Sequence, residues 1–244
     1  DNSFSYIDKL SLTSKNQLNK IENLENKLRD NIFYNYDTTK WDNLLLKDIL
    51  IDRPRNGFSP PKDCQKKSGV PVLTLSSVTG NKFSPKKVIY TNFKLKKLAN
   101  YWVNNGDLLI TRSNTRKLVG HVAIARDINE PTVYPDLIMK INCDNQIVSN
   151  LFLFHYLQVS PVRYYIMREA KGANPTMVKI NQEIVKKIPI KVPTLDKQKE
   201  TINHMNKILE KTDIYRSLIN KKIILLEDLK SKVLKDFLSN LEFV

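Results

Sequence analysis

Cysteine is nearly absent from this sequence: Cys64 and Cys143 are the only two in 244 residues, and they are not spaced as a CxxC pair. Two cysteines so far apart exclude a disulfide framework and the common structural zinc motifs. No apolar run approaches the ~20 residues that a membrane helix needs, and the start, Asp1–Ser5, resembles no signal peptide. The sequence therefore predicts a reduced, cytoplasmic protein.

Glycine is also scarce, and the six glycines nowhere form a GxG motif or a P-loop. No loop for S-adenosylmethionine or for nucleotide phosphates is therefore recognisable. Asn174-Pro175-Thr176 resembles the start of the Asn-Pro-Pro-aromatic signature of DNA amino-methyltransferases, but the second proline and the aromatic residue are missing. We interpret that segment as a turn.

Groups that carry catalysis or bind metal ions are not clustered either. His121, His155 and His204 lie far apart and form no HxxxH motif. Glu183 and Asp107 form no nuclease-like carboxylate pair with a following lysine, and no serine has a nucleophile-elbow context. We expect no catalytic residue, no metal site and no bound cofactor.

Positive charge, by contrast, is abundant. The chain has 40 Lys and Arg against 25 Asp and Glu, a formal charge of +15, and an isoelectric point near 9.6. Such an excess suits a polyanion, most commonly nucleic acid. An AT-rich genome, which enriches proteins in Lys, Asn and Ile, produces the same composition. The positions of the charges must therefore decide between nucleic-acid binding and a purely compositional excess.

The basic residues concentrate in four predicted loops of the middle of the chain. The groups are Arg53, Arg55, Lys62, Lys66 and Lys67; Lys94, Lys96 and Lys97; Arg112, Arg116 and Lys117; and Arg168, Lys171 and Lys179. Any one group can be a solvated loop tip. Four on one small globule favour DNA binding, because Lys and Arg beside Asn, Ser and Thr bind phosphates and base edges.

Side-chain chemistry divides these candidates by role. Arg112 and Arg116 suit guanine, while Asn114 and Asn174 suit adenine. The full set of predicted DNA-binding residues is Arg53, Arg55, Lys62, Lys66, Lys67, Arg112, Asn114, Arg116, Lys117, Lys171 and Asn174.

The C-terminal stretch from Thr194 to about Leu241 predicts one long amphipathic helix. Apolar residues recur there mostly every three or four positions: Ile202, Met205, Leu209, Leu218, Ile223, Leu226, Leu229, Val233, Phe237 and Leu241. Thr194 can cap the helix, and Asp196 puts negative charge in its first turn. A single helix this long must pack on a partner.

The N-terminal segment has a sequence pattern similar to that of the C-terminal helix, here called the echo. Asp8–Phe33 aligns with Asp213–Leu238 at an offset of 205 residues. The shared apolar register includes Leu18 with Ile223 and Leu28 with Val233, and the identical pairs are Asp8/Asp213, Glu22/Glu227, Leu24/Leu229 and Lys27/Lys232. Coincidence between two amphipathic helices is the alternative. We expect the C-terminal helix to pair with residues 5–33, within one chain or between two.

Between the helices lie short predicted elements without a regular βαβ rhythm. Strands are predicted at Val70–Leu75, Lys86–Tyr90, Leu108–Thr111, Val119–Ala125, Ile138–Ile141 and, at a sheet edge, Ile188–Pro193; helices at Phe93–Tyr101, Ser149–Met167 with a break at Pro161, and Asn181–Val185. This mixture favours an α+β fold with a curved, largely antiparallel sheet. The predicted domains are residues 1–36, 37–193 and 194–244.

Several motifs together resemble one half of the DNA-specificity subunit of a type I restriction–modification enzyme. They are Trp41–Asp48, Gly57–Pro60, Pro71–Val78, Gly106–Ile110, Val119-Gly120, Gly172–Asn174 and Ile188–Gln198, in an order and spacing that cover nearly the whole chain. In that family, two target-recognition domains are separated by two long helices packed as an antiparallel coiled coil, and each domain reads half of a split DNA target. Pro193–Gln198 departs from the family's Pro-Pro-Leu-x-Glu-Gln pattern.

The resemblance implies partners that supply the missing chemistry. These are a modification subunit that methylates adenine with S-adenosylmethionine and a restriction subunit that cleaves with ATP, both assembled on the helices. The chain would be a non-catalytic subunit that either forms a homodimer or is part of a longer subunit. The alternative is a helical interaction protein without DNA specificity. A nuclease or methyltransferase fragment is a third reading that lacks any catalytic constellation.

Overall fold

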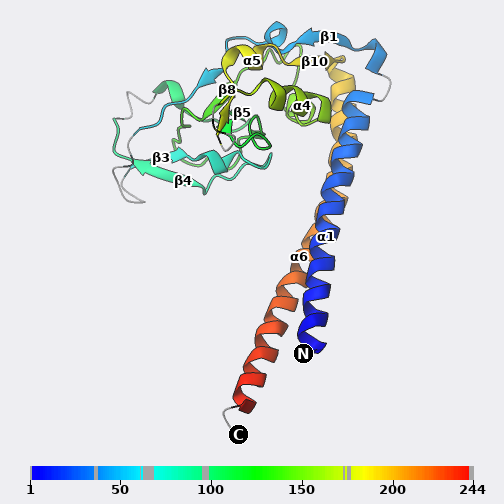
Figure 1. The fold of residues 1–244 in the computed structure, drawn as a ribbon. Helices are drawn as coiled ribbons and strands as arrows, with labels where there is room; N and C mark the ends of the chain where they lie inside the picture. Colours follow the sequence, from blue (N-terminus) through cyan, green and yellow to red (C-terminus); the bar gives the residue numbers. More distant parts are fainter. Residues whose placement is uncertain are drawn as a thin grey trace. The chain divides into compact units, whose positions relative to one another are not determined.

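The two long helices pack on each other in the computed structural model, which describes residues 2–35, 38–60, 62, 69–94, 99–172, 174 and 177–241. Helices α1 (Asn2–Asp30) and α6 (Leu195–Leu241) run antiparallel and lie side by side (Figure 1). Glu25 near the end of α1 forms an ion pair with Arg216 at 2.8 Å, and Asp8 near its start pairs with Lys230. The expected helix pairing therefore forms within one chain.

The seam between the helices follows a heptad repeat. Its buried or half-buried positions alternate by four and three residues: Ile7, Ser11, Ser14, Leu18, Ile21, Glu25 and Leu28 in α1, and Leu209, Thr212, Arg216, Ile219, Ile223, Leu226, Lys230 and Val233 in α6. A repeat of this kind produces a left-handed coiled coil.

Among the described side chains of the predicted apolar stripe, Leu218 and Leu229 are exposed and lie outside the seam. Leu218 is 56% exposed and Leu229 is 47% exposed, whereas Leu226 is 9% exposed. The prediction from three- and four-residue spacing included every apolar residue of the helix. A two-helix seam is narrower than the apolar face of a helix that packs on a globular core. The prediction was therefore wrong for the burial of these two leucines.

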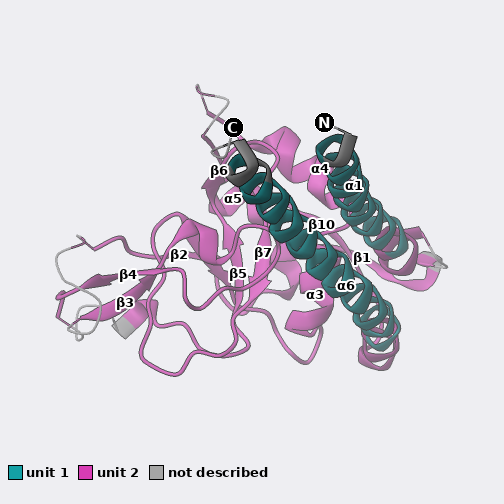
Figure 2. Cartoon of the chain, turned by 90° about the horizontal axis from the view of Figure 1, so that it is seen from below, with its two compact units in different colours: residues 1–28, 203–244 teal, residues 29–202 magenta. Residues whose placement is uncertain are grey.

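By its contacts the chain divides into two units, coloured in Figure 2. Residues 1–28 and 203–244 form the first, here called the coil, and residues 29–202 form the second, here called the globule. The domain boundaries predicted at residues 36 and 193 follow secondary structure rather than contacts, and they stay a prediction.

The globule is built on a four-stranded antiparallel sheet in the order β2 (Arg55–Asn56), β8 (Ile138–Ile141), β5 (Leu108–Thr111) and β7 (Val122–Ile124). All four residues of β5 are buried, as expected for a central strand. Three two-stranded antiparallel pairs surround it: β1 (Asp42–Leu45) with β10 (Pro189–Val192), β3 (Val70–Leu73) with β4 (Val88–Thr91), and β6 (Ser113–Asn114) with β9 (Val178–Lys179). The predicted α+β class and the edge position of the proline-containing last strand are confirmed.

Short helices complete the globule. They are α3 (Asn150–Tyr156), α4 (Ser160–Glu169) and α5 (Gln182–Lys186), with one π turn (Asn31–Asn35) and 3-10 turns at Thr38–Lys40, Leu46–Ile49, Leu75–Ser77 and Ala99–Tyr101. Ser149 caps α3 and Asn181 caps α5 through their side-chain oxygens, and Pro161 lies in the first turn of α4. The predicted break at Pro161 is confirmed. Of the helix predicted at Phe93–Tyr101, residues 95–98 lie outside the described residues, and Ala99–Tyr101 form a 3-10 turn.

Candidate nucleic-acid interface

Thr111, the last residue of β5, closes the base of the loop that carries the third basic group. Its backbone N–H donates to the His121 carbonyl at 2.8 Å, and its carbonyl accepts from the Gly120 N–H at 2.9 Å. Its hydroxyl donates to the Leu118 carbonyl at 3.1 Å and accepts from the His121 N–H at 2.9 Å. The loop from Arg112 to Gly120 is therefore held firmly where it leaves the sheet.

The loop that carries Lys171 is joined to the first by strand pairing. β6 pairs with β9, and Lys171 and Lys179 exchange backbone hydrogen bonds at 2.9 and 2.7 Å. The N–H of Ile180 donates to the Arg112 carbonyl at 2.9 Å. Two basic groups far apart in the sequence thus form one region, here called the paired-loop surface (residues 112–120, 171, 172, 174 and 177–180).

Asp136 holds the Arg112 side chain beside this surface. The Arg112 guanidinium donates to the Asp136 carbonyl at 3.4 Å and lies 4.0 Å from its carboxylate. The same carboxylate accepts from the Ser59 hydroxyl at 2.5 Å. The segment predicted as the first basic loop therefore reaches Asp136, beside the paired-loop surface, through Ser59.

Asn114 and Arg116 are also held by the protein itself. The Asn114 amide donates to the Thr79 hydroxyl at 3.1 Å, and its oxygen accepts from the Thr115 N–H at 2.8 Å. The Arg116 guanidinium donates to the carbonyl of Met167, at the end of α4. Each of the two amide atoms has one further donor or acceptor position, but these two bonds fix the orientation in which Asn114 could meet a base.

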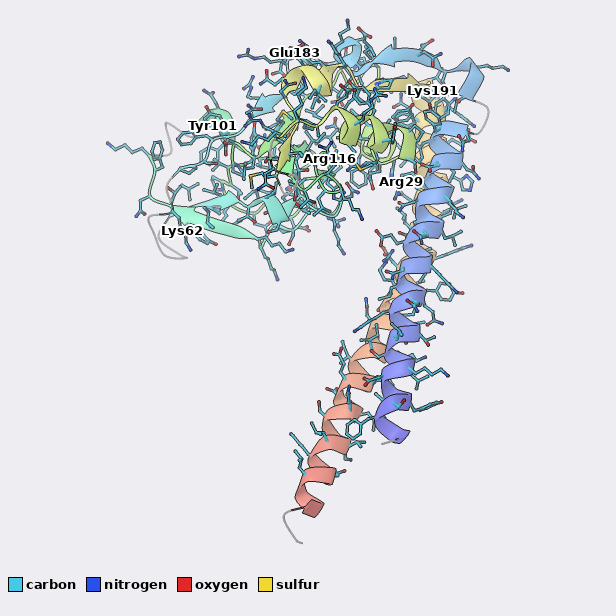
Figure 3. The ribbon with its side chains drawn as sticks, in the orientation of Figure 1. Arg29, Lys62, Tyr101, Arg116, Glu183 and Lys191 are labelled. Atoms are coloured by element: carbon cyan, nitrogen blue, oxygen red, sulfur yellow. The ribbon has the colours of Figure 1, made fainter. Side chains whose placement is uncertain are left out.

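The remaining predicted residues do not all lie on the paired-loop surface. Arg55 is half exposed and forms an ion pair with Asp52 at 3.0 Å, while Arg53 and Lys62 are exposed. Figure 3 shows Lys62 well away from Arg116. Lys117, Lys171 and Asn174 are exposed on the paired-loop surface. Lys66, Lys67, Lys96 and Lys97 lie outside the described residues.

Beside the loop from Arg112 to Gly120, the surroundings keep the imidazole of His121 neutral and the guanidinium of Arg163 charged. Burial, followed by the nearby Arg163 charge, lowers the pKa of His121 to about 4. Its Nδ1 accepts from the Gly80 N–H at 2.9 Å. Burial lowers the pKa of Arg163 only to about 10, so this side chain stays charged at neutral pH. The cation below the loop is thus permanent.

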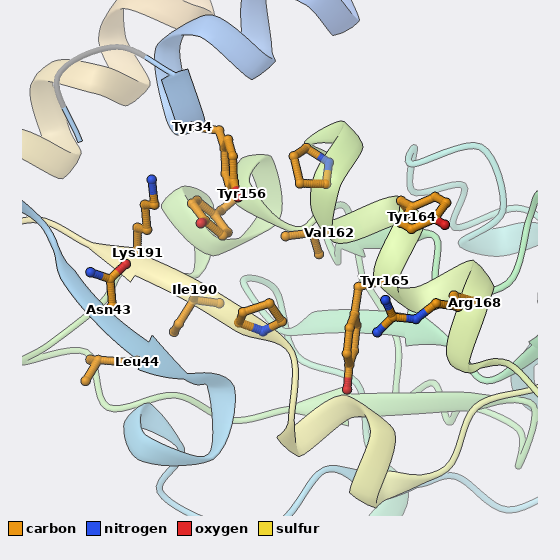
Figure 4. Close-up of a pocket in the computed structure, with 12 residues that line it drawn as sticks. Tyr34, Asn43, Leu44, Tyr156, Val162, Tyr164, Tyr165, Arg168, Ile190 and Lys191 are labelled. Atoms are coloured by element: carbon orange, nitrogen blue, oxygen red, sulfur yellow. The ribbon is translucent and has the colours of Figure 1, made fainter. Parts of the chain in front are cut away.

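A cavity of about 350 Å³ lies elsewhere in the globule, between α4 and the β1–β10 pair (Figure 4). Tyrosine and proline side chains line it, together with Lys191 and Arg168. Lys191 donates to the Thr38 hydroxyl and lies over the Tyr34 ring, and Arg168 pairs with Glu169. Because both cations already have partners within the chain, this cavity gives no support for an anion site.

The described parts of the chain contain neither a cluster of metal ligands nor a candidate membrane span. Within them, no three His, Cys, Asp or Glu side chains come together as metal ligands. None of the helices in the same ranges is both long and apolar enough to cross a membrane.

Sequence reasoning found the loops but missed the residues that hold them. Thr79, Asp136 and Arg163 each contact a predicted site residue or its loop from a distant part of the chain, and Ser59 in turn contacts Asp136. In the local sequence, each was only an ordinary polar or charged residue of a turn, a loop or, for Arg163, a helix. Such long-range partners are visible only after the sheet has brought the segments together.

Comparisons with known proteins agree with this arrangement. The family model described as "Type I restriction modification DNA specificity domain" matches residues 38–225. No curated protein sequence matches the chain.

Solved structures share the fold at low sequence identity. A chain from a structure described as showing complex assembly and conformational transition of the type I R-M system is 14% identical, with a TM-score of 0.67. The HsdS subunit from Thermoanaerobacter tengcongensis is 14% identical with a TM-score of 0.58, and the type I S subunit from M. genitalium 10% with 0.56. Each match covers 95% of this chain but only 54 to 58% of the other, so the chain spans about half their length.

Proposed function

Because the chain belongs to the type I restriction–modification DNA specificity domain family, we propose that it is a non-catalytic DNA-recognition subunit that reads one half of a split target. In this proposal its DNA is double-stranded, its location is the cytoplasm, and methylation and cleavage are carried out by separate modification and restriction subunits. The other half of the target is read by a second copy or by another recognition domain.

One observation carries the proposal: the paired-loop surface joins two basic loops on a firmly held base. Strand pairing between β6 and β9 fixes their spacing, and Thr111 fixes where the first loop leaves the sheet. Base reading needs side chains held within a fraction of an ångström, which loops anchored in this way provide. Long unanchored loops would attract DNA through their charge but would not distinguish one base sequence from another.

The residues of this surface divide into phosphate and base contacts. Lys117 and Lys171 are exposed cations suited to phosphates. Arg112 keeps 27% of its side chain exposed while Asp136 holds it, which pre-organises a guanidinium for guanine. Asn174 is exposed and suits adenine, whereas Asn114 is half-buried and held by Thr79, so fewer of its amide positions are open to a base.

The test is a binding titration of the full chain with its modification subunit. Selection from a random duplex library first defines the preferred site, and a scrambled duplex serves as reference. Lys117→Ala and Lys171→Ala should weaken binding to both duplexes and make the salt dependence shallower by ~0.9 in slope per lost phosphate contact. Arg112→Ala should mainly reduce preference for the selected site, by ~1–3 kcal/mol.

Arg126 provides a matched control. It is exposed and follows β7 at the end of the sheet away from Thr111. Arg126→Ala removes the same charge and should leave both preference and salt slope unchanged. If selection enriches no sequence with the wild-type chain, the alternative of a helical interaction protein is favoured instead.

The outer face of α6 supports the proposed scaffolding role. Ile214, Leu218, Leu225 and Leu229 are 47 to 68% exposed and recur at heptad-like spacing outside the seam. We propose that this stripe binds a helix of the modification subunit. Leu218→Glu with Leu225→Glu should abolish co-purification of that subunit and leave the seam intact, while Ile51→Glu, an equally exposed change in the globule, should not. Retained co-purification would contradict this assignment.

A further inference from the structure

We propose that helix α4 positions the paired-loop surface through two arginines, Arg116 and Arg163, here called the arginine pair. In this proposal Arg116 affects DNA reading by holding its loop and not by contacting a base. The proposal rests on the proposed function, because discrimination between DNA sequences is what the loop position serves.

Arg116 binds the end of α4, where backbone carbonyls lack partners. The Ala170 N–H still donates to the Ile166 carbonyl, but the Lys171 N–H donates to the Lys179 carbonyl and so leaves the helix. The carbonyls of Met167 and Ala170 accept instead from Nη1 of Arg116, at 2.6 and 3.2 Å. A guanidinium is also favoured at this end by the helix dipole.

Arg163 makes the opposite connection, from the helix to the loop. Its Nη2 donates to the Lys117 carbonyl at 3.0 Å. Its Nη1 is buried and has no hydrogen-bond partner among the described residues. A buried guanidinium without a carboxylate is a poor source of stability. The contribution that remains for Arg163 is to fix the carbonyl of Lys117.

The far end of the loop rests on the same helix. Gly120 has a φ of +73°, and a Cβ there would lie 2.5 Å from Ile166 Cγ2 and 3.1 Å from Arg163 Nη1. Arg163, Ile166, Met167 and Ala170 follow one another at helical spacing, so they share one face of α4. That face contacts the first loop at Arg116, Lys117 and Gly120.

The second loop depends on α4 through the chain itself. Residue Lys171 follows α4 after a single residue and immediately pairs with Lys179. A shift of α4 against the first loop would therefore change the distance between both loops. Because base contacts tolerate misplacement of only ~0.5 Å, such a shift should reduce discrimination before it reduces affinity.

Hydrogen exchange of the full chain without DNA tests the arginine pair directly. The N–H groups of Leu118 and Val119 donate to the Thr115 carbonyl inside the loop. In Arg163→Met and Arg116→Met these amides should exchange about tenfold faster. Arg168→Met is the matched control, since Arg168 lies on the same helix but pairs with Glu169 at the surface. Unchanged exchange in both variants would overturn the proposal.

A DNA titration with the modification subunit then separates positioning from contact. Arg163→Met and Arg116→Met should reduce the ratio of affinities for the selected and scrambled duplexes about fivefold to tenfold, with an unchanged salt slope. Arg163→Lys keeps the charge and one donor and should restore most of the ratio; it also serves if the methionine variant fails to fold. A salt slope reduced by ~0.9 in Arg116→Met would mean a direct phosphate contact and would refute the role given to Arg116.

The two experiments fail in different ways. If wild type shows no preference between the duplexes, the proposed function is wrong, while the exchange result still decides whether the arginine pair holds the loop.

Discussion

The coil and the globule are stabilised in different ways. In the coil, equivalent positions recur every seven residues, and even charged side chains such as Glu25 and Arg216 occupy the seam. In the globule, strands of two to four residues pair with distant ones, as Arg55 does with Lys140 and Asp42 with Val192. The coil distributes its stability over many similar layers, whereas the globule depends on a few contacts that occur once.

This difference suits two different tasks. A repeating surface can bind other helices along its length, and a polar layer within it costs little. A recognition surface must instead hold particular side chains in particular places, so each of its supports is individually important. The two regions can also be observed separately, because Trp41 and Trp102, the only tryptophans, both lie in the globule.

The largest effect is expected from a charge in the seam of the coil. Leu226→Asp should destabilise the coil by about 3 kcal/mol, since it replaces a buried leucine by a carboxylate. Far-UV circular dichroism should show earlier loss of helix while tryptophan fluorescence, which reports on the globule, melts as in wild type. Leu229→Asp, three residues away and exposed, is the control and should change neither signal. Joint melting of both regions would show that they are not independent.

Mild acid should act on the globule through His155. Burial, followed by the Arg29 charge, lowers the pKa of this histidine from 6.5 to about 3. Because the unfolded chain binds a proton that the folded one excludes, stability present above pH 6.5 is lost as the pH falls. Between pH 7 and pH 5 the loss should be about 2 kcal/mol from this group.

Urea unfolding followed by tryptophan fluorescence at several pH values measures that loss. His155→Phe should remove it, because the residue already packs against Phe33 and Phe154. The variant should keep a smaller pH slope, because His121, whose pKa is lowered to about 4, also loses stability as the pH falls. Identical pH slopes for wild type and variant would contradict the assignment.

A smaller difference is expected between two glycines of the globule. Gly120 and Gly106 both have positive φ, but only Gly120 lacks room for a Cβ. Gly106→Ala should cost only the strain of the left-handed backbone, about 1 kcal/mol. Gly120→Ala should cost about 1.5 kcal/mol more, because it also overlaps Ile166. Equal midpoints in urea for the two variants would show that α4 yields at this position.

The smallest effect is expected from the ion pair in the coil. The Glu25 side chain is 11% exposed and that of Arg216 33% exposed, so solvent screens the pair in part. Glu25→Ala should lower the stability of the coil by about 1 kcal/mol. The double variant Glu25→Met with Arg216→Leu should restore the wild-type stability of the coil or exceed it, because apolar side chains pack well in the seam. Thermal melts at 222 nm would decide, and a double variant weaker than the single one would mean that the pair is needed as it stands.

The sequence predicted best where its pattern is periodic. The long helix expected from Thr194 to about Leu241 begins at Leu195 and ends at Leu241, and Leu108–Thr111 is a strand as expected. The two-residue strands β2, β6 and β9 were not predicted. Such short strands have no internal period, and only their distant partners make them strands.

The candidate site was less predictable than the fold. Composition and turn residues predicted Arg112–Lys117 as a loop between two strands, but Ser113–Asn114 within it form β6, and nothing in the local sequence connected the segment with Lys171. Neither did they show that Asn114 would bind Thr79 or that Arg116 would bind the end of α4. Side-chain roles in a loop are set by what packs beneath it, which local sequence does not contain.

The antiparallel coil has a further consequence when it is considered with the echo between its helices. Glu22 and Lys27 of α1 correspond to Glu227 and Lys232 of α6, and all four are exposed. Since the helices run in opposite directions, turning the rod end over end places each helix on the other. A molecule that binds the exposed Glu22 and Lys27 near one end of the coil would therefore meet the same two side-chain types, in inverted orientation, near the other end.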